Sequence, residues 1–148
     1  TTEIYTLSLH DALPIFELYA TLIIPLDFTR RDFRELSAWL VEQGVTFVNL
    51  QPLTPLPGTE IFSQYKDRLL IKREDHHLWD MAHVALQPEK MSIRWFYLNL
   101  LTSYWRVIMR PQNMIRLVRT YGIKENWRML WGSQRVSLQY IEKILRGR

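Results

Sequence analysis

The stretch FELYATLIIPLDFTRRDFRELSAWLVEQGVTFVNL, residues 16–50, decides the fold of this chain. Residues 16–25 and residues 45–50 are rich in β-branched and aromatic side chains, and each run predicts a buried strand. Between them, residues 30–43 carry apolar side chains at helical spacing, preceded by Thr29 as a candidate N-cap. This order predicts a βαβ unit with parallel strands. The nearly continuous apolar strands also predict cover on both faces of the sheet.

The chain then becomes irregular and finally helical. Residues 51–59 form a loop that three prolines hold rigid, and a short helix follows at residues 60–65. Residues 75–84 have the pattern of a short helical segment, and Pro88 prevents it from continuing. Three longer helices are predicted after Ser92, a candidate N-cap: residues 92–110, 112–120 and 124–145. The predicted fold class is α/β.

Composition limits the chemistry that the chain can perform. Its 148 residues are 47% hydrophobic and 23% charged, which is typical of a globular domain with a real core. The chain has no cysteine, so it forms no disulfide and ligates neither zinc nor an iron–sulfur cluster through thiolates. No apolar run approaches the roughly 20 residues that span a bilayer. We expect a cytoplasmic protein.

The C-terminal region is basic and aromatic. Residues 91–148 carry 11 Lys and Arg against 2 Asp and Glu, a balance of +9, whereas residues 16–90 carry 8 against 11. Aromatic side chains at helical spacing usually belong to a core, which is the first expectation here. Contact with an anionic membrane surface is the second expectation, and nucleic acid is the least favoured partner.

The first fifteen residues, TTEIYTLSLHDALPI, match one reading frame of a common sequencing adapter at every position. We therefore interpret residues 1–15 as an adapter-derived segment and exclude His10 and Asp11 from the catalytic candidates. On this interpretation the natural polypeptide begins at or before Phe16.

The loop LQPLTPLPGTEIF, residues 50–62, is a candidate binding site, because ligands of open α/β sheets and βα barrels bind beyond the carboxyl ends of strands. Its residues 54–59, TPLPGT, resemble the TP-x-PGT signature of radical S-adenosylmethionine (SAM) enzymes, especially those with an upstream cobalamin-binding domain. The resemblance extends in order from Phe16 to Tyr97 and includes Ile23-Ile24-Pro25, Thr29-x-x-Asp32-x-x-x-Leu36, Trp79-Asp80, Pro88 and Met91-Ser92.

The resemblance implies a fold and a chemistry. Residues 16–90 are expected to be the C-terminal part of a TIM-like radical SAM barrel, and residues 91–148 a basic helical region. The parent enzyme would use SAM, a [4Fe–4S] cluster and cobalamin, and would act by a 5′-deoxyadenosyl radical or by methyl transfer on a small-molecule or lipid-like substrate. The residues expected to line the wall beside SAM, mainly through their backbone, are Gln51, Pro52, Thr54 and Gly58.

Two departures and two alternatives accompany this interpretation. The chain lacks the family's C-x-x-x-C-x-x-C motif and its cobalamin domain, so alone it is expected to be inactive. One alternative is a non-enzymatic basic helical module that binds a membrane surface or a partner protein. The other is a small metal hydrolase, because His76, Asp80 and His83 would share one face of a helix and could bind Zn²⁺ or Fe²⁺. Packing or capping by these histidines is the simpler expectation, and no metal site is predicted.

Overall fold

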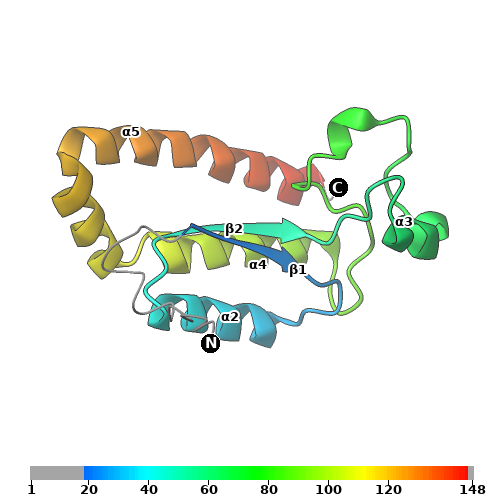
Figure 1. The fold of residues 1–148 in the computed structure, drawn as a ribbon, viewed down its shortest axis with the longest axis horizontal. Coiled ribbons are helices and arrows are strands. Elements are labelled where there is room, and N and C mark those ends of the chain that lie inside the picture. The colour runs from blue at the N-terminus through cyan, green and yellow to red at the C-terminus, as the bar shows by residue number, and fades with distance from the viewer. Residues whose placement is uncertain (1–18, 147–148) are drawn as a thin grey trace, which may run out of the picture.

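The computed structural model describes residues 19–146, without the side chains of residues 129, 130, 133 and 136. Figure 1 shows two strands, a set of helices beside them and a long irregular connection. The elements are β1 (Tyr19–Ile24), α2 (Arg30–Glu42), β2 (Phe47–Pro52), α3 (Glu60–Tyr65), two 3₁₀ turns (Lys66–Arg68 and His76–Leu78), α4 (Ile93–Ile108) and α5 (Pro111–Arg146). The segment interpreted as adapter-derived lies outside the described residues.

The predicted βαβ unit is confirmed. β1 and β2 are parallel neighbours in a two-stranded sheet, with Tyr19 opposite Phe47 and Ile24 opposite Pro52. β2 begins two residues later than predicted and continues through Gln51 and Pro52, which the sequence analysis placed in the loop. The architecture is mixed α/β, in agreement with the predicted class.

Local side chains explain why α2 begins and ends where it does. The Thr29 hydroxyl accepts a hydrogen bond from the Asp32 backbone N–H, and the Asp32 carboxylate accepts one from the Thr29 backbone N–H at 2.7 Å, which together form a capping box. The bond from the Thr29 N–H, with a second from the Thr29 hydroxyl at 2.8 Å, holds the pKa of the Asp32 carboxyl below its ordinary value. At the other end, Gly44 has a φ of 68°, a left-handed conformation that stops the helix.

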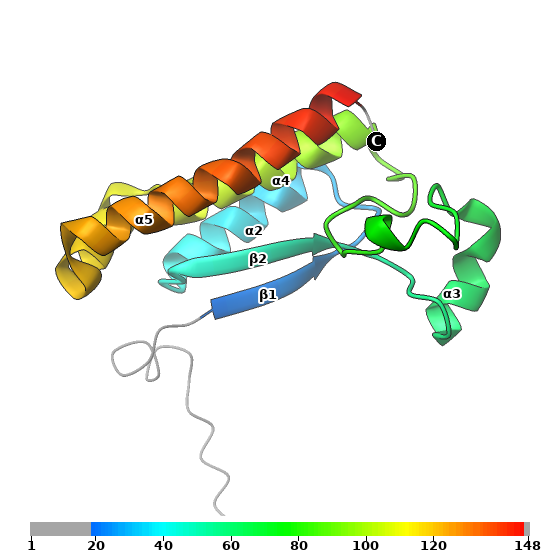
Figure 2. The same ribbon diagram turned by 90° about the horizontal axis from the view of Figure 1, so that it is seen from above.

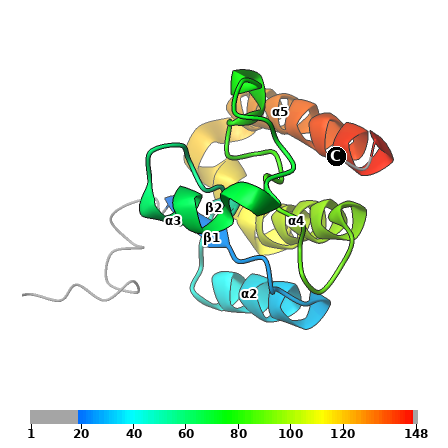
Figure 3. The same cartoon turned by 90° about the vertical axis from the view of Figure 1, so that its right-hand side faces the viewer.

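The core lies between one face of the sheet and the helices α2 and α4, as Figures 2 and 3 show from two further directions. Phe33 is fully buried at its centre, in edge-to-face contact with Phe28 and Phe96. The opposite face of the sheet is open in the described residues, where Tyr19 is 63% and Ile23 is 64% exposed. The expectation of cover on both faces is therefore wrong for this part of the chain, because its described helices pack on one face only.

The outer edge of β2 is closed by a side chain from α4. The Tyr104 hydroxyl accepts a hydrogen bond from the Leu50 N–H at 2.8 Å and lies 3.1 Å from the Leu50 carbonyl oxygen. Pro52, two residues further along the same edge, has no N–H to offer. Both positions on this edge are thus unavailable for pairing with another strand.

The helical region packs onto the βαβ unit through polar anchors as well as apolar contacts. Arg110 donates to the Val41 carbonyl at 2.6 Å and to the Val45 carbonyl at 3.4 Å, at the C-terminal end of α2. Asn113 is buried and donates to the Thr46 carbonyl at 3.2 Å. The start of α5 is therefore fixed against the turn between α2 and β2.

The last two predicted helices are present as the two parts of α5, on either side of a kink. Gly122, with φ of 78° and ψ of 169°, breaks the helix where the sequence predicted a boundary. After this kink α5 runs antiparallel to α4 along one side of the molecule (Figure 1). Within the described residues, no helix combines the length and the apolarity that crossing a bilayer requires.

Candidate functional site

The carboxyl ends of β1 and β2 lie at the same end of the molecule, where α3 and the irregular connection gather (Figure 2). The Leu53 N–H extends the ladder by donating to the Ile24 carbonyl at 3.0 Å. The connection returns to the same end, because the Glu89 N–H donates to the Leu26 carbonyl at 2.9 Å. This is the position at which ligands bind in α/β folds.

The TPLPGT loop is rigid because it satisfies its own polar groups. The Thr54 hydroxyl donates to the Pro52 carbonyl at 3.0 Å. The Thr59 N–H donates to the Leu56 carbonyl at 3.2 Å, which closes a β-turn with Pro57 and Gly58 at its centre. Gly58 has a φ of 91°, as the third position of a type II turn requires. Thr59 then caps α3 by accepting from the Phe62 N–H.

Replacing Gly58 should strain this turn. Gly58→Ala is expected to cost about 1–2 kcal/mol of unfolding free energy, because the left-handed conformation disfavours a Cβ although nothing lies within 4 Å of it. The matched control is Gly132→Ala in α5, which also has open space and should gain about 0.5–1 kcal/mol from higher helix propensity. Urea titrations followed by circular dichroism measure both. Equal effects of the two substitutions would contradict the turn assignment.

The four residues predicted to face SAM have different surroundings. Pro52 is buried at the end of β2, and Gln51 before it is half-buried. Thr54 is half-buried, whereas Gly58 is exposed at the tip of the turn. None of the four lines the pocket beside the C-terminal end of α5. Their role toward SAM stays a prediction.

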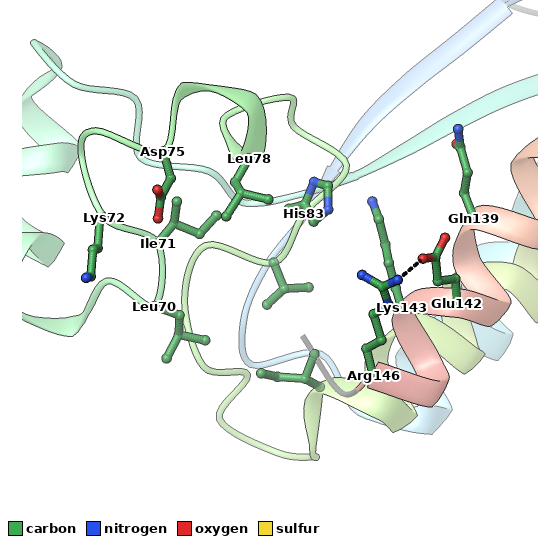
Figure 4. Close-up of a pocket in the computed structure, with 12 residues that line it drawn as sticks. Leu70, Ile71, Lys72, Asp75, Leu78, His83, Gln139, Glu142, Lys143 and Arg146 are labelled. Carbon is green, nitrogen blue, oxygen red and sulfur yellow. Dashed lines mark ion pairs between the residues drawn. The ribbon is translucent and has the colours of Figure 1, made fainter.

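That pocket has a volume of about 430 Å³ and lies between the irregular connection and the C-terminal end of α5 (Figure 4). Its apolar lining comes from the irregular connection and the start of α4, whereas α5 contributes polar and charged side chains. Figure 4 shows Lys143 and Arg146 extending from α5 toward the segment that carries Leu78 and His83. Arg146 is paired with Glu142 at 2.6 Å. The apolar residues that line the pocket are Leu70, Ile71, Leu78, Val84 and Ile93.

Lys143 joins the two walls of this pocket. Its ammonium group donates to the Ala82 carbonyl at 2.8 Å and lies 5.7 Å from the Tyr97 ring centroid and 5.6 Å from that of Tyr140. Burial lowers the pKa of Lys143, and the nearby Asp80 carboxylate opposes that effect. Burial raises the pKa of Tyr97, the hydroxyl of which accepts from the Val84 N–H at 2.8 Å, to about 12. Through these contacts Lys143 acts as a clamp that holds α5 against the irregular connection.

The histidine cluster does not form the helical face that the spacing suggested. His76 lies in a 3₁₀ turn, and Met81 has a φ of 59°, so the segment from residue 76 to residue 83 is not one helix. His83 and Asp80 remain neighbours, with Nδ1 2.9 Å from Oδ1. Although burial opposes it, the hydrogen bonds from His83 and from the backbone at Ala82 hold the pKa of Asp80 below its ordinary value. Within the described residues, no group of three His, Asp or Glu side chains could hold a metal ion.

The arrangement is therefore suited to binding and positioning. It places a rigid loop, a lined pocket and a half-buried lysine near the carboxyl ends of the strands. The sequence analysis missed Lys143 and Tyr97 as members of this region. No local motif marks them. Lys143 contacts Ala82, which lies 61 residues earlier, and Tyr97 contacts Val84, which lies 13 residues earlier in the irregular connection.

Comparison with known proteins gives one informative similarity. Bacteriochlorophyllide d C-8(2)-methyltransferase of Chlorobaculum tepidum is 25% identical over 108 residues, which cover 66% of this chain and 24% of the relative. The chain therefore spans about a quarter of the length of this curated relative. No protein-family model matches the chain. No solved structure matches it either.

Proposed function

We propose that this chain is the C-terminal part of a radical SAM enzyme whose complete form is cobalamin-dependent. The complete enzyme would act by a 5′-deoxyadenosyl radical or by methyl transfer on a small-molecule or lipid-like substrate. In this proposal residues 16–90 belong to a partial βα barrel, and residues 91–148 form a basic helical cover. The fragment alone is inactive, since the cluster motif belongs to the remainder of the enzyme.

The observation that carries the proposal is a parallel βαβ unit leading directly into the TPLPGT turn. The strand order and the position of the turn agree with the ordered motifs of the radical SAM resemblance. The similarity to a relative named as a methyltransferase supports the same origin, and that relative's greater length supports a longer parent. The closed outer edge of β2 is also consistent with a last strand in a partial barrel.

The residues present fit only part of the required cofactor set. The chain has no cysteine, so it does not ligate a [4Fe–4S] cluster, and no step of the reaction is assigned through that group. Toward SAM, the open space around Gly58 allows a ligand to approach the backbone closely. In this proposal Gln51, Pro52, Thr54 and Gly58 line the wall beside SAM and exclude water from it. Bound cofactors would supply the radical and the methyl group.

The decisive experiment begins at the gene. The locus is sequenced upstream of the Phe16 codon, and the frame is expected to continue into a C-x-x-x-C-x-x-C motif, with the codons of residues 1–15 absent. A locus that encodes residues 1–15 directly behind a start codon would contradict the proposal, because the natural protein would then lack cysteine.

The complete protein is next purified without oxygen and tested for reductive conversion of SAM to 5′-deoxyadenosine. Gly58→Ala should reduce this conversion, whereas Gly132→Ala should leave it unchanged. Equal activity of the two variants would remove the TPLPGT turn from the SAM site while leaving the family assignment to the gene sequence.

A further inference from the structure

The outer face of α5 carries a row of exposed apolar side chains. Beyond the kink at Gly122 they recur at spacings of three, four or seven residues, which places them on one side of the helix. A single polar residue, Gln134, shares that side. We call this row the α5 stripe; its members are Ile123 (78% exposed), Trp127 (69%), Trp131 (68%), Leu138 (63%), Ile141 (40%) and Leu145 (72%).

The α5 stripe is not part of the core that the sequence analysis favoured for these aromatic residues. The opposite side of the same helix supplies the buried contacts, where Tyr140 packs against Tyr97 and Tyr104. Figures 1 and 3 show α5 along an outer side of the molecule, with α4 on its inner side. Six large apolar side chains on one exposed helix face are far more than scattered surface residues.

Charge beside the α5 stripe indicates what it contacts. Lys124, Arg128 and Arg135 lie along one border of the stripe by helical position and are exposed. Arg128 is paired with Glu125 at 3.2 Å, but no ion pair among the described residues involves Lys124 or Arg135. Residues 123–148, which carry the stripe, contain 6 Lys and Arg against 2 Asp and Glu, a balance of +4, so the surroundings of the stripe are positive.

We propose that the α5 stripe seats this chain on an anionic membrane surface, with the helix axis parallel to the bilayer. A helix with tryptophan and aliphatic residues on one face and basic residues beside them is suited to the boundary between headgroups and acyl chains. The apolar side chains enter that boundary, and the lysine and arginine side chains contact anionic headgroups. The proposal rests on the exposed face of α5 and is independent of radical SAM chemistry.

The test is flotation of the 148-residue chain with lipid vesicles. Binding is expected to phosphatidylcholine vesicles that contain phosphatidylglycerol, and it should weaken in high salt or with phosphatidylcholine alone. The double variant Trp127→Ser/Trp131→Ser should weaken binding by about tenfold or more, because it removes two large apolar side chains from the stripe. Lys124→Gln and Arg135→Gln should each weaken binding about fivefold.

Trp39→Ser is the matched control, because Trp39 is 48% exposed on α2, on a different helix from the stripe. It should bind like the unmodified chain. Circular dichroism confirms that each variant is folded, which is expected because the replaced side chains are exposed. Binding that is unaffected by the double variant, or no binding to either vesicle by the folded chain, would overturn the proposal.

Two other occupants of the stripe give distinct results. If a second copy of the chain covers the stripe, the chain forms a dimer that the double variant disrupts, and the dimer does not bind vesicles. If the remainder of a longer parent covers it, the 148-residue chain binds vesicles but the product of the complete gene does not. Either result would overturn membrane contact, whereas vesicle binding by both proteins that the double variant removes supports it.

Discussion

Phe33→Ala should remove a large share of the unfolding free energy of this chain. Phe33 is fully buried, and its ring centroid lies 5.4 Å from those of both Phe28 and Phe96. Removing such a ring costs about 3–5 kcal/mol, because transfer energy is lost and a cavity remains. A small domain has only about 5–15 kcal/mol in total. Urea unfolding followed by circular dichroism measures the loss.

The control for this substitution lies on the same helix. Arg34 is exposed, and Arg34→Ala should change the unfolding free energy by no more than about 0.5 kcal/mol. A cost below about 1 kcal/mol for Phe33→Ala would mean that α2 does not pack on α4 as described.

Alkaline pH should destabilise the chain through its buried tyrosines. Burial raises the pKa of Tyr97 from 10.0 to about 12, and burial likewise raises the pKa values of Tyr104 and Tyr140. Because the folded state holds these protons more tightly than the unfolded state, stability is complete below pH 10 and falls as pH rises toward 12. Tyr97 alone should account for about 2 kcal/mol of the loss by pH 12.

Lys143, which packs on Tyr97, acts in the opposite direction. Its pKa is lowered from 10.5 by burial, so its deprotonation favours the folded state as pH rises. That contribution is complete by about pH 10.5, before Tyr97 ionises in the folded chain. The net alkaline loss therefore falls mainly between pH 10.5 and 12.

Tyr97→Phe provides the test of this pH dependence. The variant is less stable at neutral pH by about 1–3 kcal/mol, because the Val84 N–H loses its buried acceptor. It should nevertheless lose less stability than the unmodified chain between pH 10 and pH 12. Urea midpoints measured across this range give the comparison, and parallel losses in the two proteins would show that Tyr97 is not the titrating group.

The βαβ unit was predictable from the sequence because its signals are local and agree with each other. Thr29 and Asp32 cap α2, Gly44 stops it, and strand-forming residues lie on both sides. The same holds for Ser92 at the start of α4 and for Gly122 within α5. Such signals depend on a few neighbouring residues, so no tertiary contact is needed to read them.

Orientation and distant partners were not predictable in this way. α4 is apolar almost all round, so its pattern did not reveal that Phe96, Tyr97 and Leu100 face inward while Trp95 and Trp105 are 45% and 52% exposed. In the candidate site, the turn at Gly58 followed from residue types, but the clamp formed by Lys143 depends on a contact with Ala82.

The hydroxyl of Tyr104 affects the edge at which another strand can join the sheet. With Leu50 occupied by that hydroxyl and Pro52 unable to donate, the outer edge of β2 disfavours a further strand, and a strand joining this sheet is expected to pair with β1. Amide exchange should report this asymmetry, with a Leu50 amide that is protected even though it faces away from β1. A strand from elsewhere in a longer protein, or from a second molecule in a concentrated solution, is therefore expected to add beside β1.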